Sequence, residues 1–256
     1  MQNIHLKGLR NTRDLGGMQA ADGVVRAGLL LRGGHLHDVK PREAVALQAE
    51  YNLSTIIDLR TDIERDEKPD AAIPGAEYRH MPILDEATVG ITHEQRSDDR
   101  ASLLARLPDI RMLYASMVSG EAAQRLGAVV RFVMQSAVRG QAVLYHCTEG
   151  KDRTGLVSLM LLSVLGVPED VIMQDYLFTN GYANARARKY YWLVRLLKRD
   201  KEAAAKIRGL FIADASYLEA AMDAAKQDYG SMSAFLTHGL GIGEQEQLAF
   251  KESMIV

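Results

Sequence analysis

Three short apolar runs constrain the fold of this chain more than any other feature: Leu29–Leu31, Thr55–Leu59 and Ala142–Tyr145. The second and third runs are almost continuously apolar, which is typical of strands buried on both faces of a parallel sheet. Helical patterns lie between the runs, at Pro41–Glu50 and at Gly120–Arg139. Strands that alternate with helices predict an α/β fold, with a central and mostly parallel sheet flanked by helices.

The remainder of the chain is mostly helical in pattern. An apolar helix is expected from Thr154 to about Leu165, because Gly166 and Pro168 follow it. The 256 residues show no repeat and no low-complexity linker, so we expect a single domain over residues 1–256 with an inserted or appended helical part. The further helices expected are Glu169–Asn180, a stretch within Tyr182–Ile212, Ser216–Gln227 and Ser231–Leu240.

A polar loop leads from the run Ala142–Tyr145 into the helix that starts near Thr154. A helix N-terminus presents unpaired backbone N–H groups and a partial positive charge, so a loop at this place can bind phosphate. Cys147 begins the loop, and Arg153 lies six positions later, where its planar fork can meet two phosphate oxygens. The other residues expected to hold the anion are His146, Thr148, Glu149, Gly150, Lys151, Asp152, Thr154 and Gly155.

This loop favours nucleophilic attack by a thiolate. Cys147 is the only cysteine of the chain, and the positive field at the helix start favours its ionised form. The thiolate can attack a phosphate ester and form a phosphocysteine, while Arg153 and the loop amides stabilise the charged oxygens. Thr154 can donate a hydrogen bond to the sulfur and ease its departure. These steps need no metal ion and no cofactor. The alternative is a cysteine that is merely a small buried hydrophobe.

The loop resembles the signature of the cysteine-based tyrosine phosphatases, in which His-Cys is followed by five residues, Arg, and Ser or Thr. Its second half, Gly150–Gly155, is similar to the form found in a bacterial and fungal branch that includes the secreted mycobacterial phosphatase B. Gly33 departs from that branch, where serine is usual. Three further segments resemble its motifs and extend the likeness over most of residues 11–180: Asn11–Gly17, Leu31–Gly34, and Ile57–Arg60 with Glu64–Arg65.

The resemblance implies a phosphatase fold and the hydrolysis of phosphate monoesters in proteins, and of phosphoinositides in some members. It also implies a general acid on a loop beyond the Asp-Leu-Arg strand, past a short segment with proline. Asp85 holds that place after Pro82, with Glu86 and Asp98 as alternatives. A carboxylic acid there would protonate the leaving oxygen.

Three charged residues of the loop have open roles. Asp152 can orient Arg153, act as a proton donor or as a base for water, or brace the loop through backbone amides. Lys151 would favour substrates with more than one phosphate, whereas Glu149 would repel a second phosphate. His146 is expected to be buried and bonded to the backbone, so that it tunes the thiolate.

Two pairs near the other motifs are expected to be structural. Arg13 and Asp14, followed by two glycines, predict a tight turn in which the two side chains form an ion pair below the active site. Asp58 and Arg60 lie at the end of a buried run, and they too are expected to stabilise the fold.

Residues 182–212 combine many basic residues with apolar residues at helical spacing, among them Trp192, the only tryptophan of the chain. The purely structural interpretation is a helix with a solvated basic face. The family resemblance implies a helical lid at this place, so we expect the segment to cover or flank the Cys147 pocket and to move on substrate entry.

Composition narrows the remaining possibilities. The net charge of −2 provides no global field for nucleic acid, and no run reaches the roughly 18 apolar residues of a membrane span. One thiol cannot form an internal disulfide, which suits the cytoplasm, although export without a signal peptide stays open. The expected partner is a phosphorylated protein or lipid, and the oligomeric state stays open. The alternatives are a catalytically silent phosphate-binding module and a sulfurtransferase or arsenate reductase.

Overall fold

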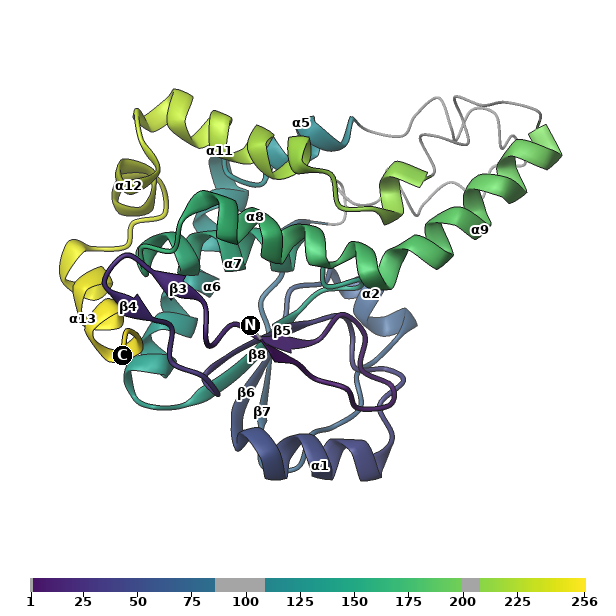
Figure 1. Cartoon of the computed structure of the whole chain (residues 1–256), viewed down its shortest axis with the longest axis horizontal. Coiled ribbons are helices and arrows are strands. Elements are labelled where there is room, and N and C mark those ends of the chain that lie inside the picture. The colour runs from purple at the N-terminus through teal and green to yellow at the C-terminus, as the bar shows by residue number, and fades with distance from the viewer. Residues whose placement is uncertain (1, 86–108, 199–207) are drawn as a thin grey trace.

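The computed structural model describes residues 2–85, 109–198 and 208–256, and a six-stranded sheet lies at its centre (Figure 1). The strand order is β1-β2-β5-β8-β6-β7. Neighbours from β5 to β7 are parallel, and β1 and β2 join the sheet antiparallel. The mostly parallel α/β sheet is therefore confirmed. The strands are β1 (Gln2–Asn3), β2 (Arg13–Asp14), β5 (Leu30–Gly33), β6 (Leu53–Asp58), β7 (Glu77–His80) and β8 (Ala142–His146).

Helices make up most of the remaining described structure, together with a small hairpin of β3 (Gln19–Ala20) and β4 (Gly23–Val24). None of the described helices is both long and apolar enough to cross a membrane. The helices are α1 (Pro41–Tyr51), α2 (Asp62–Glu67), α5 (Ile110–Ser116), α6 (Gly120–Val138), α7 (Asp152–Val164), α8 (Glu169–Phe178), α9 (Asn180–Lys198), α11 (Ala215–Tyr229), α12 (Met232–Ala234), the π-helical η1 (Phe235–Gly239) and α13 (Glu244–Met254).

The sheet has an apolar core on each face because side chains alternate along its strands. In β8, Val143 and Tyr145 belong to the larger core, which also contains residues of α6 and α7. Ala142 and Leu144 belong to the smaller core, which also contains residues of α1. Figure 1 shows α1 on one side of the sheet and α6, α7 and α8 on the other. The helix α7 is buried along almost its whole length.

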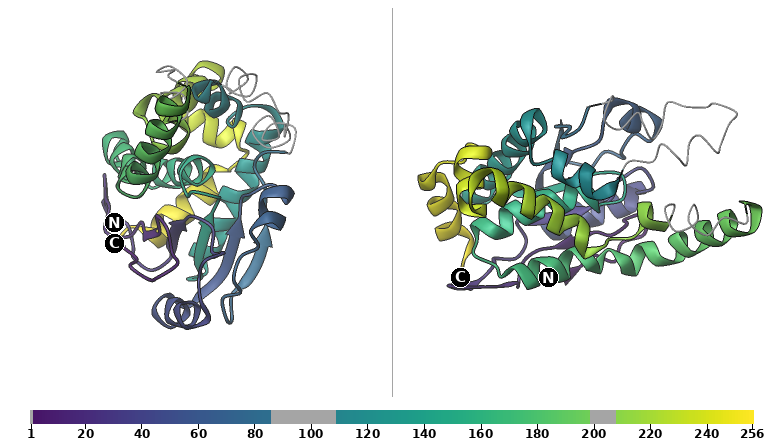
Figure 2. Two further views of the ribbon diagram at one scale, coloured as in Figure 1. Left: turned by 90° about the vertical axis from the view of Figure 1, so that its right-hand side faces the viewer. Right: turned by 90° about the horizontal axis from the view of Figure 1, so that it is seen from above.

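The predicted helix Glu169–Asn180 is present as α8, which ends two residues earlier, at Phe178, and α9 begins at Asn180. The side chain of Asn180 bonds both backbone groups of Ala213. One predicted helix differs from the structure. The predicted helix Ser231–Leu240 is instead the short α12 followed by the π-helical η1. Figure 2 shows α9 extending outward, well past the sheet.

Candidate active site

The loop at Cys147 lies between the end of β8 at His146 and the start of α7 at Asp152. Its sulfur is almost completely buried, since Cys147 is 2% exposed. Gly150 has a positive φ of 67° and lies against the backbone of Gly33, where a Cβ would come within 2.5 Å of the Gly33 carbonyl. Both conditions require glycine. Because α7 begins at Asp152, directly after this bend, the unpaired amide groups of its first turn face the loop that begins with Cys147.

Gly33, the departure from the family pattern, has a local reason. A Cβ at this position would lie 2.6 Å from Oγ1 of Thr12. The threonine hydroxyl in turn donates to the carbonyl oxygen of Arg10. The bulk that a serine would add at residue 33 is thus supplied by Thr12 from the neighbouring segment.

Arg153 is held by a buried carboxylate. Its Nη1 and Nη2 donate to the two carboxylate oxygens of Glu64, at 2.5 and 2.8 Å. The hydroxyl of Thr148 donates to the same carboxylate at 2.6 Å. Burial alone would raise the pKa of Glu64, but the hydrogen bond and charge of Arg153 outweigh it and lower this pKa to about 2. Burial alone would lower the pKa of Arg153, but the hydrogen bond and charge of Glu64 outweigh it and raise this pKa.

Glu64 is positioned by a helix start. Thr61 is the N-cap of α2, and the Glu64 carboxylate accepts a hydrogen bond from the Thr61 backbone N–H at 3.0 Å. The Glu64 backbone N–H donates back to the Thr61 hydroxyl, which completes a capping box. This role of Glu64 was not predicted from the sequence. The Thr-x-x-Glu spacing was visible in the sequence, but only the tertiary structure brings Glu64 to Arg153.

Asp152 has partners other than those expected. The hydroxyl of Tyr114 donates to its carboxylate at 2.5 Å, and the Tyr114 and Tyr176 hydroxyls lie 2.7 Å apart. Because Tyr114 donates its proton to Asp152, Tyr176 must donate to Tyr114. Glu64 hydrogen-bonds Arg153, whereas Asp152 is bonded by Tyr114 and lies 3.4 Å from Nζ of Lys151. The charge of Asp152 still contributes to the raised pKa of Arg153, and the roles expected of Asp152 stay predictions. Burial, followed by the charge of Asp152, raises the pKa of Tyr114.

Lys151 is also directed away from the expected place. Its side chain is 2% exposed, and its Nζ donates to the carbonyl oxygens of Leu210 and Ile212 at 2.7 and 3.0 Å. Lys151 is therefore not an exposed charge that could contact a second substrate phosphate in this structure. The lysine instead ties the signature loop to residues that follow α9.

The N-terminal motif supports the loop from the other side. Asn11 donates from Nδ2 to the carbonyl oxygens of Glu149 and Gly150, at 3.1 and 2.9 Å. Nη2 of Arg32 donates to the same Gly150 carbonyl at 2.9 Å. Since Arg32 belongs to β5, the sheet itself fixes the bend of the loop.

The predicted ion pair between Arg13 and Asp14 is wrong. Arg13 instead pairs with Asp175 of α8 at 2.6 Å, and Arg32 pairs with the other Asp175 oxygen at 2.5 Å. Burial would raise the pKa of Asp175, but the two guanidinium groups outweigh it and lower this pKa. Asp14 accepts hydrogen bonds from the backbone of Gly16 and Gly28. Successive side chains of β2 point to opposite faces of the sheet, so Arg13 and Asp14 cannot meet.

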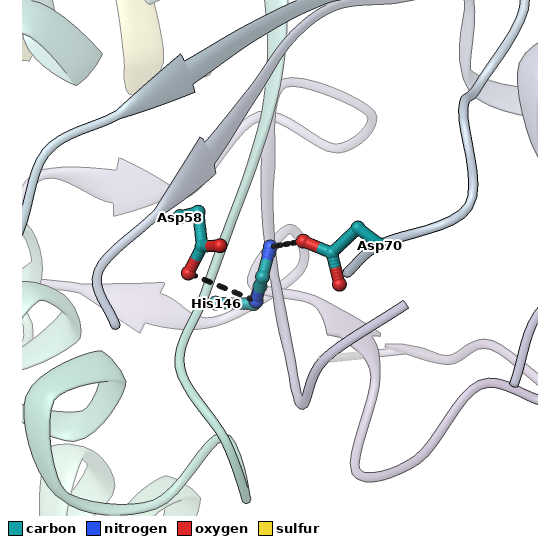
Figure 3. A group of neighbouring side chains, drawn as sticks. All are labelled: Asp58, Asp70 and His146. Carbon is teal, nitrogen blue, oxygen red and sulfur yellow. Dashed lines mark ion pairs between the residues drawn. The ribbon is translucent and has the colours of Figure 1, made fainter. Parts of the chain in front are cut away.

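His146, which precedes Cys147, lies in a buried cluster of charges with Asp58 and Asp70 (Figure 3). Its Nε2 is 2.9 Å from Oδ2 of Asp70, and its Nδ1 is 4.0 Å from Asp58 and 3.3 Å from the Cys147 carbonyl oxygen. The expected burial and backbone contact are present, and the two carboxylates are additional. Burial would lower the pKa of His146, but the carboxylates of Asp70 and Asp58 leave it raised.

Asp58, Asp70 and His146 lie close enough together for their ligand atoms to share a metal ion. Arg60 already contacts both carboxylates, at 2.7 Å to Asp58 and 2.9 Å to Asp70, and Tyr78 donates to Asp58 at 2.7 Å. A metal ion would have to compete with this guanidinium. We therefore assign the cluster a structural role, as the sequence predicted for Asp58 and Arg60.

Asp85 lies at the edge of the sheet where the signature loop begins. It follows β7, which is parallel to β6 and β8, so the three strands present their carboxyl ends at the same edge. Ile83 and Leu84 are buried, whereas Asp85 is exposed. The competing candidates Glu86 and Asp98 lie outside the described residues. The general acid role of Asp85 stays a prediction.

A mostly parallel α/β sheet has a central strand that leads into a tight loop, which begins with a cysteine and runs into a helix start with a braced arginine. This is the architecture of the cysteine-dependent phosphatases. The chain belongs to the tyrosine phosphatase family, whose model matches residues 4–256. It is therefore an enzyme of the protein tyrosine phosphatase type.

Known relatives agree with this assignment. A protein of Cupriavidus necator, named as a tyrosine-protein phosphatase, is 31% identical over 247 residues, which cover 91% of this chain and 82% of the relative. The triple specificity protein phosphatase PtpB of Mycobacterium tuberculosis is 35% identical over 107 residues, 38% of each chain. A tyrosine-protein phosphatase of Nostoc commune is 28% identical over 169 residues, 66% of this chain and 52% of the relative.

Proposed function

We propose that this phosphatase hydrolyses phosphate monoesters, phosphotyrosine among them, through a phosphocysteine intermediate on Cys147. The observation that carries the proposal is the placement of the Cys147 sulfur at the start of a loop whose arginine is braced by Glu64. A preorganised guanidinium stabilises developing charge on phosphoryl oxygens without reorganising during the reaction.

The first step forms the intermediate. The Cys147 thiolate attacks phosphorus, the phosphorus–oxygen bond to the leaving group breaks, and the leaving oxygen takes a proton from Asp85. Asp152 is the second candidate for this proton, although its carboxylate already accepts a hydrogen bond from Tyr114. Arg153 and the loop amides hold the equatorial oxygens throughout.

The second step regenerates the enzyme. Water attacks phosphorus, the phosphorus–sulfur bond breaks, and a carboxylate takes the proton that water loses. Thr154 can assist the departing thiolate: its Oγ1 is buried and has no hydrogen-bond partner among the described residues, so its proton is available to the sulfur. Inorganic phosphate is then released.

The same proposal extends to further classes of substrate. Phosphoserine, phosphothreonine and phosphoinositides are further substrate candidates, and the name of the mycobacterial relative states more than one specificity for that protein. A pocket of about 120 Å³ beside Glu149 is lined by Arg10, Asn11, Thr179 and Tyr182 among others. Its mixed lining would let a peptide or headgroup extend past the loop. A phosphate-release panel over these substrates measures the preference directly.

Residues 182–212 would flank the entrance, as the family resemblance implied. Both ends of this segment lie near the signature loop: Tyr182 and Phe211 line the pocket beside Glu149, and Lys151 binds the carbonyl oxygens of Leu210 and Ile212. The helix α9 extends outward (Figure 2), and Trp192, which belongs to it, is 54% exposed. Closure over Cys147 would therefore require α9 to swing inward about these ends.

Release of phosphate from para-nitrophenyl phosphate without added metal tests the proposal. Wild type should turn over, and Cys147→Ser should lose turnover while still binding orthovanadate, because a serine hydroxyl has no comparable ionised population at neutral pH. Turnover by Cys147→Ser within about tenfold of wild type would refute the nucleophile. Vanadate binding with no turnover by wild type would favour the silent phosphate-binding module.

A further inference from the structure

The helix α9 (Asn180–Lys198) carries three exposed apolar residues in its second half. Trp192, Leu193 and Leu196 lie at positions i, i+1 and i+4, so they share one helix face. Trp192 is 54% exposed, Leu193 46% and Leu196 72%. A helix of a globular protein ordinarily buries such a stripe in the core, so an exposed stripe marks a surface for a partner.

The charge of α9 indicates what kind of partner fits. Between Asn180 and Lys198 the sequence has five basic residues and no acidic residue, although the whole chain has a net charge of −2. Arg188 and Lys189 are exposed beside the stripe, and Arg195 is half-buried. The helix thus combines leucine, tryptophan and tyrosine with basic residues around them. This composition is typical of helices that lie in the plane of an anionic membrane surface.

We propose that this face of α9 binds the surface of an anionic lipid bilayer. Trp192, Leu193 and Leu196 enter the boundary between headgroups and acyl chains, and the basic side chains contact lipid phosphates. A second copy of the chain fits this face less well, because two copies of α9 would bring like charges together. The projection of α9 past the sheet lets it reach a flat surface (Figures 1 and 2).

Trp192 makes the test specific, because it is the only tryptophan of the chain. Wild type is mixed with vesicles of phosphatidylcholine with phosphatidylserine, or of phosphatidylcholine alone. Co-sedimentation and a blue shift of Trp192 emission are expected with the anionic vesicles, and both should weaken as salt is added. Leu196→Glu should bind roughly tenfold or more weakly, since it removes buried apolar area and adds a negative charge.

Two further variants complete the experiment. Lys189→Glu on the same face should also weaken binding, without removing an apolar side chain. Leu248→Glu is the matched control, because Leu248 is a 50% exposed leucine on α13, and this variant should bind vesicles as wild type does.

Several results would overturn the proposal. One is the absence of co-sedimentation, and another is binding that leaves Trp192 emission unchanged or that Leu248→Glu weakens equally. Self-association without vesicles that Leu196→Glu abolishes would assign the stripe to a second copy. Binding to polyglutamate but not to anionic vesicles would assign it to an acidic protein partner. A blue shift with vanadate in the absence of vesicles, together with no shift on anionic vesicles, would assign it to lid closure.

Discussion

Glu64 shows how one buried carboxylate prepares the phosphate-binding arginine. Both of its carboxylate oxygens accept hydrogen bonds from Arg153, and one of them also accepts a hydrogen bond from the hydroxyl of Thr148. The arginine fork is therefore fixed in one orientation before substrate arrives. Fixing a charged group in advance lowers the cost of ordering it at the moment of reaction.

Glu64→Gln should lower kcat/KM by roughly tenfold to hundredfold, because an amide neither matches both donors of Arg153 nor balances its charge. Glu67→Gln is the matched control, since Glu67 is an exposed residue of the same helix. Steady-state kinetics on both variants measure the effect. Equal kcat/KM for all three proteins would contradict the bracing role.

The same residue predicts a pH dependence of stability. The pKa of Glu64 falls from 4.5 to about 2 on folding, so the stabilisation is fully present above pH 4.5 and is lost as the pH falls toward 2. The free energy of unfolding of wild type should decrease over this window more steeply than that of Glu64→Gln. Urea denaturation at several acidic pH values tests this. Parallel curves would refute it.

Asp85→Asn should slow phosphotyrosine hydrolysis by roughly 10²–10⁴-fold, the usual contribution of general acid catalysis. A substrate with a very acidic leaving group needs no proton, so it should be affected much less. The comparison of both substrates in one variant is its own control. Equal losses would exclude Asp85 as the proton donor and favour Asp152.

At the scale of elements, the central strands were predictable and the edge strands were not. Thr55–Leu59 and Ala142–Tyr145 were recognised because burial on both faces leaves an almost continuous apolar run, and the structure places β6 and β8 there. The edge strand β7 reads Glu-Tyr-Arg-His and is mostly exposed, so nothing in its composition required a strand.

The candidate site, too, was only partly predictable from the sequence. The strand, loop and helix around Cys147 are contiguous, so residue types and spacing were sufficient to find them. Glu64 and Tyr114 reach the loop from α2 and α5. Asp175 of α8 acts through Arg32, which pairs with it and donates to Gly150 of the loop. Their roles depend on long-range packing, which a single sequence does not specify. The Arg13–Asp14 pair was mispredicted because a tight turn was expected where the structure has the strand β2, which directs the two side chains to opposite faces.

The helix α5 contributes a single hydroxyl to the loop, and its removal is predicted to be costly. Tyr114→Phe leaves the Tyr176 hydroxyl and the Asp152 carboxylate without their shared partner. The free energy of unfolding should fall by about 1–3 kcal/mol. Tyr229→Phe is the control, because Tyr229 is a 38% exposed tyrosine of α11. Its free energy of unfolding should fall by much less. Similar losses in urea denaturation would contradict the account.

At the scale of the whole molecule, the fold concentrates reactivity on one thiol. Cys147 is the only cysteine, so oxidation to a sulfenic acid cannot be trapped as an internal disulfide. Mild peroxide should therefore inactivate the enzyme, and an added thiol should restore activity. Activity that survives peroxide over minutes would mean that Cys147 is shielded or not ionised.

The most direct test of the central claim is to trap the intermediate. Enzyme and para-nitrophenyl phosphate are mixed, quenched in acid within the first turnovers, digested and analysed by mass spectrometry. We predict a phosphoryl group on the peptide that contains Cys147, and none on Cys147→Ser treated in the same way. Phosphate release with no phosphorylated Cys147, or phosphate on His146 instead, would contradict the mechanism.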